Sequence, residues 1–411
     1  MKTKQKTVEI AKSRKENSLN AGKEIGRKLS KIDTKTVFLF FSVKYKPDEL
    51  IKGILSEIDA EICGCSGAGV ICNDEIIEKG AVAIGFNKEG LSFGLGVGTN
   101  INKNPFQAGI MAINSALDSL KKKNLKKIFA KFYAASINDP TQIIQKTPSC
   151  AVMTFIDGLC GREEEVLKGI TSRFAFPMPL AGGSAGDDLI LKETIQICNN
   201  KAYKNSVVTA LLVTNSKLCF AIDHGWIPRK ETVLVTKAKG RRVYELNGKP
   251  AIEAYAKLLG VKKDKLIKEK QIAFKTGLRH PLAIVSVANE YFLRHPKEIL
   301  EDGSITFFSE VSEGVALVAT DASRESLINA GLNAAKKITR TLNKEIEALF
   351  IFNCVARKVF LGKKAEEEIK RIFEITNAPT IGFYTYGEQA FSQATPISHR
   401  NQTINMMGIG K

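Results

Sequence analysis

Apolar runs alternate with amphipathic segments along the chain, and the same order of segments recurs three times. Runs rich in β-branched and aromatic residues predict strands covered on both faces at 36–42, 149–157 and 347–354. A helical period of apolar positions follows each strand, at 47–58, 163–174 and 363–375. Each predicted helix leads to a short strand ending in small residues, at 63–69, 180–188 and 381–388. A further apolar strand then follows, at 80–86, 206–213 and 403–409. The pattern predicts a weak internal strand–helix–strand repeat.

Further strand and helix patterns accompany the copies, at 91–99 with 108–123, 231–238 with 249–259, and 314–320 with 326–338. Strands that alternate with helices predict an α/β protein with mixed β-sheets and covering helices. We expect residues 1–35 to be an N-terminal helical lead-in with apolar positions at Ala11, Leu19, Ala21, Ile25 and Leu29. We place two domains after it, 36–230 and 231–411.

Positive charge is concentrated in two segments of the chain. The 411 residues carry 61 basic and 43 acidic side chains, a net charge of +18. Residues 1–35 and residues 230–270 each contribute a net charge of +7. Such a surface attracts phosphates or an acidic protein. No helix-turn-helix, Cys/His finger or aromatic RNA-binding pair accompanies it, so we expect no specific nucleic-acid partner.

The apolar runs are too short to cross a membrane. The longest, such as 36–42 and 207–213, fall far short of the roughly 20 residues that a membrane helix needs. The Lys-rich N-terminus lacks the apolar core of a signal peptide. We therefore expect a cytoplasmic protein whose eight cysteines need no disulfide pairing.

Glycine and serine follow the predicted strands at positions suited to holding a ligand. The first turn contains Ser66 and Gly67, and the second contains Gly183 and Ser184 followed by Asp187 and Asp188. Backbone N–H groups in such turns can bind a carboxylate or phosphate, and the carboxylates can hold an amino group. The residues are compatible with an amino-acid ligand, while a purely structural turn remains the alternative reading.

The order of eight motifs along the chain gives a family resemblance. VFLFFS, GCSGAGVI, AGGSAGDD, DHGWIP, VYELNGKPAIEAY, FNCVARKVFLG, GFYTYGE and SHRNQT follow one another in that order. Individually these motifs are weak, but in this order they make the chain similar to the FIST family of paired FIST N and FIST C sensory domains. The resemblance covers residues from about 18 to 411.

The resemblance implies a non-catalytic sensor of small molecules such as amino acids. FIST domains occur beside histidine kinases, chemotaxis receptors and diguanylate cyclases, so a partner of one of these kinds is implied. Some bacterial members resembling this chain bind haem and sense nitric oxide. This chain carries no kinase or cyclase segment, and we expect it to pass its signal to a separate protein.

The C-terminal part holds four more candidate ligand contacts. Arg357 follows a buried strand, where ligand crevices of α/β sheets lie, and its planar fork suits a carboxylate. Tyr386, Glu388 and His399 lie in the last motifs. Arg357 and Glu388 match positions that the family pattern carries; a salt bridge between these two residues is the alternative to ligand binding.

Three other chemistries have partial signals. Gly182–Gly186 reads G-x-S-x-G, which would make Ser184 the nucleophile of an acyl hydrolase, but the residues after it alternate like a strand and not like the helix of a nucleophile elbow. Cys63, Cys65 and Cys72 lack the second cysteine pair of a typical zinc site. A haem would need an axial ligand, for which His399 is the candidate.

Overall fold

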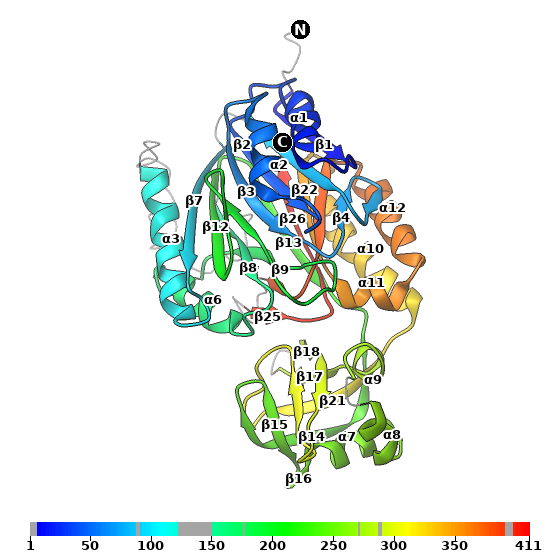
Figure 1. Ribbon diagram of the computed structural model, residues 1–411. Helices are drawn as coiled ribbons and strands as arrows, with labels where there is room; N and C mark the ends of the chain where they lie inside the picture. The colour runs from blue at the N-terminus through cyan, green and yellow to red at the C-terminus, as the bar shows by residue number, and fades with distance from the viewer. Residues whose placement is uncertain are drawn as a thin grey trace.

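The computed structural model describes residues 6–87, 91–121, 150–175, 177–269, 272–286, 290–390 and 398–411. It confirms the mixed α/β class: four sheets and their covering helices (Figure 1). Three six-stranded sheets form one body, and the fourth belongs to an insert that lies below the body in the figure. No helix in these ranges is both long and apolar enough to cross a membrane.

The three sheets of the body share one strand order. The first sheet runs β1 (Val8–Ser13), β6 (Ala81–Phe86), β2 (Thr36–Phe41), β3 (Glu61–Ser66), β10 (Gln196–Cys198) and β11 (Lys201–Tyr203). The second runs β7 (Leu91–Thr99), β12 (Ser206–Thr214), β8 (Cys150–Asp157), β9 (Leu180–Ala185), β24 (Glu388–Ala390) and β25 (Ser398–Arg400). The third runs β13 (Leu218–Asp223), β26 (Ile404–Gly410), β22 (Ile346–Cys354), β23 (Thr380–Thr385), β4 (Val70–Cys72) and β5 (Glu75–Ile77). In each, only the two middle strands are parallel to one another, so the predicted threefold pattern corresponds to three sheets of one design.

The last two strands of every sheet come from a different copy of the repeat. Hairpin β4–β5 follows β3 in sequence but pairs with β23 of the third sheet. Hairpin β10–β11 follows β9 but pairs with β3, and hairpin β24–β25 follows β23 but pairs with β9. The three copies therefore exchange hairpins in a closed cycle.

Helices cover the outside of the three sheets and phenylalanines fill the space between them. Helices α1 (Ser18–Leu29) and α2 (Pro47–Leu55) cover the first sheet, and α3 (Pro105–Lys121) and α6 (Glu163–Thr171) cover the second. The third is covered by α10 (Arg324–Thr341) and α12 (Lys364–Thr376), with α11 (Val355–Leu361) at its end. Between the sheets, Phe38 packs against Phe155 and Phe350, so one aromatic from each sheet meets at the centre.

The insert comprises residues 227–321 and separates β13 from α10 in the third copy (Figure 1). Its sheet runs β18 (Tyr291–Arg294), β17 (Leu282–Val285), β21 (Ala316–Asp321), β14 (Ile227–Lys239), β15 (Arg242–Leu246), β20 (Ile305–Phe307) and β19 (Pro296–Ile299), with β16 (Lys249–Pro250) beside β15. Its helices are α7 (Ala251–Leu259), α8 (Lys263–Glu269) and α9 (Thr276–Arg279).

The structure differs from the predicted pattern at the N-terminus and in the segments assigned to the second and third copies. Residues 8–13 form strand β1, so the N-terminal helix begins only at Ser18, where the Asn17 side chain caps the N–H of Asn20 at 2.9 Å. The segments 231–238, 249–259 and 314–320 belong to the insert, whereas β13 and α10 occupy the equivalent places in the third copy. The domain division at 230/231 stays a prediction; the second and third sheets both take strands from either side of it.

Candidate functional site

The turns after β3, β9 and β23 meet at the centre of the body and hydrogen-bond to one another. More than one hydrogen bond joins each pair of turns, among them Ser66 Oγ to Gly186 O (2.7 Å), Tyr386 N to Ser184 O (3.0 Å) and Ala68 N to Tyr384 O (2.9 Å). The hairpin exchange brings the turns together, because at each of them the chain leaves one sheet and enters another. The structure thus brings together the three small-residue turns that the sequence singles out.

The polar groups of the first four candidate residues already have protein partners. Ser66 and Ser184 are completely buried. The N–H of Gly67 donates to Phe41 O at 2.9 Å, and the N–H of Ser184 donates to Gly387 O at 2.7 Å. A Cβ on Gly183 would lie 2.3 Å from the Thr385 side chain. These turns hold one another in the structure, and their contact with a ligand stays a prediction.

Asp187 organises the loop that follows the second turn. Its carboxylate accepts hydrogen bonds from the backbone N–H groups of Leu191 (2.9 Å), Lys192 (2.6 Å) and Glu193 (3.0 Å), and from the Tyr386 hydroxyl. The Asp188 carboxylate instead accepts a bond from Ser42 Oγ at 2.6 Å, and burial raises its pKa.

The same loop is not the strand that its alternating sequence predicts. Asp188, Leu189 and Leu191 have φ values of 54°, 64° and 57°, a left-handed conformation that is rare for leucine. Strand β10 begins only at Gln196. The strand prediction is wrong because the alternating residues form a tight loop. Asp187 binds the backbone of this loop, and Leu189 and Leu191 line a cavity.

Arg357 is buried and paired within the protein, and its partner is Glu368 and not Glu388. The guanidinium is completely buried and forms an ion pair with Glu368 of α12. It also donates to Asn353 Oδ1 (3.0 Å), His224 O (2.7 Å) and Leu327 O (2.9 Å). The predicted salt bridge to Glu388 is therefore wrong, because β22 and the buried face of α12 place Glu368 closer.

Glu388 is buried among hydroxyl groups. Its carboxylate accepts bonds from Thr403 N (3.0 Å), Thr403 Oγ1 (2.7 Å) and the Thr385 hydroxyl. Burial raises the pKa of this carboxyl to about 7 despite those donors. Glu388 thus joins the ends of β23, β24 and the chain before β26 in one contact.

A cavity lies where the insert meets the carboxyl ends of the parallel strands. Its volume is about 60 Å³, enough for about two water molecules. The body contributes residues that follow β8, β9, β22 and β23, which are the strand ends where ligands bind in α/β sheets. The lining is mostly apolar: Gly158, Leu159, Leu189, Leu191, Ala273, Phe274, His295, Phe308, Cys354, Val355, Ala356, Tyr386 and Asn401.

Two residues of this lining have defined polar roles. His295 donates from Nε2 to Ala273 O at 2.7 Å, and burial lowers its pKa to about 4. The ring is therefore neutral at physiological pH, which leaves Nδ1 as a hydrogen-bond acceptor. Asn401 accepts hydrogen bonds from Ser309 Oγ (2.8 Å) and His295 N (3.4 Å), so it ties the insert to the body at the cavity wall.

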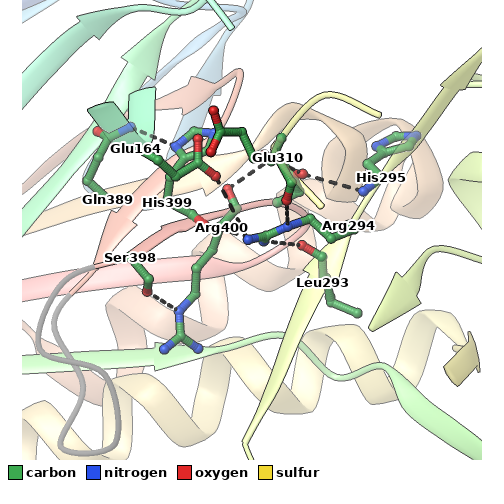
Figure 2. Close-up of polar contacts among 11 residues, drawn as sticks. Glu164, Leu293, Arg294, His295, Glu310, Gln389, Ser398, His399 and Arg400 are labelled. Carbon is green, nitrogen blue, oxygen red and sulfur yellow. Dashed lines mark hydrogen bonds and ion pairs between the residues drawn. The ribbon is translucent and has the colours of Figure 1, made fainter. Parts of the chain in front are cut away.

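Charged side chains hold the insert against the body, and Figure 2 shows those around Arg294. Arg294 of β18 donates to Glu310 O within the insert (2.7 Å) and to His399 O of the body (3.5 Å). Its guanidinium also lies 3.8 Å from Glu164 at the start of α6. Arg400 of β25 reaches Glu290 of the insert at 3.1 Å and stacks over Phe292.

The surroundings of His399 do not fit a haem iron. The ring is 1% exposed, and its Nδ1 lies 3.3 Å from Gln389 Nε2 (Figure 2). A Cβ placed on Gly387 would lie 2.6 Å from Nε2, so backbone covers the second ring nitrogen. Burial also lowers the pKa of His399 to about 3. His295, the histidine that does line the cavity, faces a space far smaller than a porphyrin.

Ser184 also lacks the arrangement of a hydrolase nucleophile. It lies within strand β9, and its Oγ accepts a hydrogen bond from Gln389 Nε2 at 2.9 Å. Asp187, the first carboxylate after Ser184 in sequence, holds the loop after the strand. A serine nucleophile needs a sharp strand-to-helix turn and a histidine base at hydrogen-bond distance.

Of the ten site residues predicted from the sequence, Tyr386 lines the cavity. The cavity residues of the insert were not predicted. Phe274, His295 and Phe308 are far from the body in sequence, and none belongs to a recognisable motif. One signal was present: Leu189 and Leu191 follow two aspartates in a segment too short for a buried helix. Both are at least 36% exposed, as is Phe274, so apolar surface gathers at this edge.

Comparison with known proteins agrees with the order of motifs. The FIST N domain model matches residues 35–249, and the FIST C domain model matches residues 251–391. The chain is also similar to the uncharacterized protein MJ1623 of Methanocaldococcus jannaschii, with 23% identity over 391 residues, which are 91% of this chain and 70% of that protein. With models of both domains covering most of its length, the chain belongs to the FIST family of sensory domains.

Proposed function

We propose that this protein is a sensor whose small-molecule site is the cavity between the insert and the body. The observation that carries the proposal is the position of the cavity: the carboxyl ends of two parallel strand pairs form one wall, and the insert forms the other. A ligand there would touch both parts at once. Its binding would favour one position of the insert and so change the surface offered to a signalling partner.

The lining supports a small, uncharged and largely apolar ligand. Eight of the lining side chains are leucine, valine, phenylalanine or alanine, and the Tyr386 hydroxyl already donates to Asp187. His295 Nδ1 supplies an acceptor for one hydrogen-bond donor of the ligand. The volume of about 60 Å³ means that the insert must move outward to admit more than a few heavy atoms.

The amino-acid class implied by the family stays a second candidate. Its support is chemical: Asp187 and Asp188 follow the second turn, Glu388 follows the third, and carboxylates can hold the amino group of such a ligand. The burial of Arg357 by Glu368 argues against that guanidinium as the carboxylate partner. A signalling protein such as a histidine kinase, chemotaxis receptor or diguanylate cyclase remains the proposed recipient of the signal.

We expect a thermal-shift screen to separate the two ligand classes. Phenol, indole and the twenty amino acids would be tested against the full chain. A cavity ligand stabilises by RT ln(1 + [L]/Kd), about 2.7 kcal/mol at a hundredfold excess over Kd. The substitution Leu191→Trp fills the cavity and should abolish the shift of a cavity ligand while leaving the ligand-free protein folded.

Ile190→Trp is the matched control for that variant. Ile190 is the neighbouring residue, is 54% exposed and lies outside the cavity lining, so the same substitution should leave the shift intact. An amino acid that stabilises both variants equally would place the ligand elsewhere. A panel in which nothing stabilises the wild type beyond solvent controls would contradict the sensor proposal.

A further inference from the structure

A groove with a net positive charge follows the outer edge of the first sheet. Its volume is about 850 Å³, and we call it the basic groove. One wall is β1 and α1; the other is the end of α12, the segment 377–379 that follows it, and residues 72–73 at the end of β4. The lining includes two carboxylates, Glu9 and Glu24, and six cations: Lys6, Lys12, Lys15, Arg27, Lys28 and Lys31. The lining residues therefore carry a net charge of +4, although Lys12 and Arg27 also pair with Glu75 and Glu57 outside the lining. Much of the positive excess of residues 1–35 gathers there.

Strand β1 presents backbone hydrogen-bonding groups to this groove. It is the outermost strand of the first sheet and pairs with β6 on one side. The N–H of Asn87 donates to Thr7 O at 2.9 Å, which makes the odd-numbered residues of β1 the ones bonded to β6. The N–H and C=O groups of Val8, Ile10 and Lys12 consequently point away from β6, toward the groove.

The two faces of an added strand would meet different chemistry. Ala11 packs with α1 on the helix side of the first sheet, whereas Val8 faces the central core. Alternate side chains of a strand placed beside β1 would therefore lie next to the cations of α1. The intervening side chains would face the apolar wall made by Phe373, Ala378 and Pro379.

We propose that the basic groove binds an extended acidic segment of a partner protein, which adds a strand to β1 and has an acidic residue at every second position. Edge strands recruit peptides in this way, with main-chain bonds giving affinity and alternate side chains giving specificity. Among the described lining residues Phe373 is the single aromatic and is half-buried, so the groove lacks the stacking platform that a single-stranded nucleic acid uses. The proposal concerns partner recognition and is independent of the ligand cavity.

The probe is a fluorescein-labelled, end-blocked octapeptide of alternating Glu and Val, titrated with the full chain and followed by anisotropy. Binding should weaken as NaCl rises, and a peptide with Gln in place of Glu should bind at least tenfold more weakly. The double variant Lys15→Glu/Lys31→Glu should weaken binding at least tenfold. The control pair Lys52→Glu/Lys336→Glu changes the net charge equally on exposed helix positions outside the groove and should bind like wild type.

A second pair of variants tests the strand addition itself. Lys12→Pro removes an outward N–H and no bond to β6, whereas Lys12→Ala removes the same side-chain charge and keeps the N–H. Binding at least fivefold weaker in Lys12→Pro than in Lys12→Ala, with unchanged thermal unfolding, supports the proposal. Equal binding by the two variants, equal binding of the Gln peptide, or displacement of the peptide by an oligothymidylate that binds Lys12→Pro normally would overturn it.

Discussion

Arg357→Leu should lower the free energy of unfolding by about 3–5 kcal/mol, the cost of breaking a buried ion pair by removing one partner. The variant leaves the Glu368 carboxylate fully buried without its cation. It also leaves the carbonyls of His224 and Leu327 without their donor. Urea denaturation followed by far-UV circular dichroism measures the loss.

Two further variants make that result interpretable. Arg371→Leu removes an exposed partner of Glu367 on the same helix, and surface pairs contribute about 0–1 kcal/mol. The double variant Arg357→Leu/Glu368→Leu should recover part of the loss because no charge is then left buried and unpaired. If Arg357→Leu lowers the free energy of unfolding no more than Arg371→Leu does, the structural role of Arg357 is contradicted and Arg357 is again a ligand candidate.

Glu388→Gln should remove a pH dependence of stability between pH 5 and pH 8. The folded-state pKa of about 7 lies above the ordinary value of 4.5, so the folded protein holds this proton more tightly than the unfolded chain. The resulting stabilisation is complete below pH 4.5 and is lost as the pH rises through 7. From pH 5 to pH 8 the loss amounts to about 2.5 kcal/mol in wild type.

The measurement is the free energy of unfolding of wild type and variant at both pH values. Their difference should shift by about 2–3 kcal/mol in favour of Glu388→Gln at pH 8. His295 and His399, whose pKa values burial lowers to about 4 and 3, act in the opposite sense. They cancel in the comparison because both proteins retain them. Glu374→Gln, on an exposed position of α12, is the control, and an equal shift there would contradict a special role of Glu388.

Local pattern was sufficient for the strands and helices of the three repeats because their apolar runs carry the period of the element they form. Residues 36–41 and 346–354 are buried along almost their whole length, as their sequences predict. Pattern failed at residues 8–13, where charged and apolar residues suit a helix or an edge strand equally. There the pairing of β1 with β6, some seventy residues away, decides the outcome.

The site was predictable in its motifs and not in its geometry. The sequence singles out the three turns, but their mutual hydrogen bonds depend on which sheet each hairpin joins. The partner of Arg357 depends on the packing of α12 against β22, which places Glu368 and not Glu388 at the guanidinium. The cavity requires His295 and Phe274 from an insert between β13 and α10, whereas in the described residues of the other two copies α1 follows β1 and α3 follows β7 directly.

The cyclic exchange of hairpins has a consequence for the order in which this protein can be completed during synthesis. The first sheet has all its strands once residue 203 has left the ribosome. The second must wait for the hairpin at residues 388–400, although its other four strands end at residue 214. Hairpin β4–β5 emerges early and has no sheet to join until residue 385 is made. The nascent chain therefore exposes unpaired strand edges while the insert is being synthesised. A chaperone that binds unfolded segments would be needed most during that period.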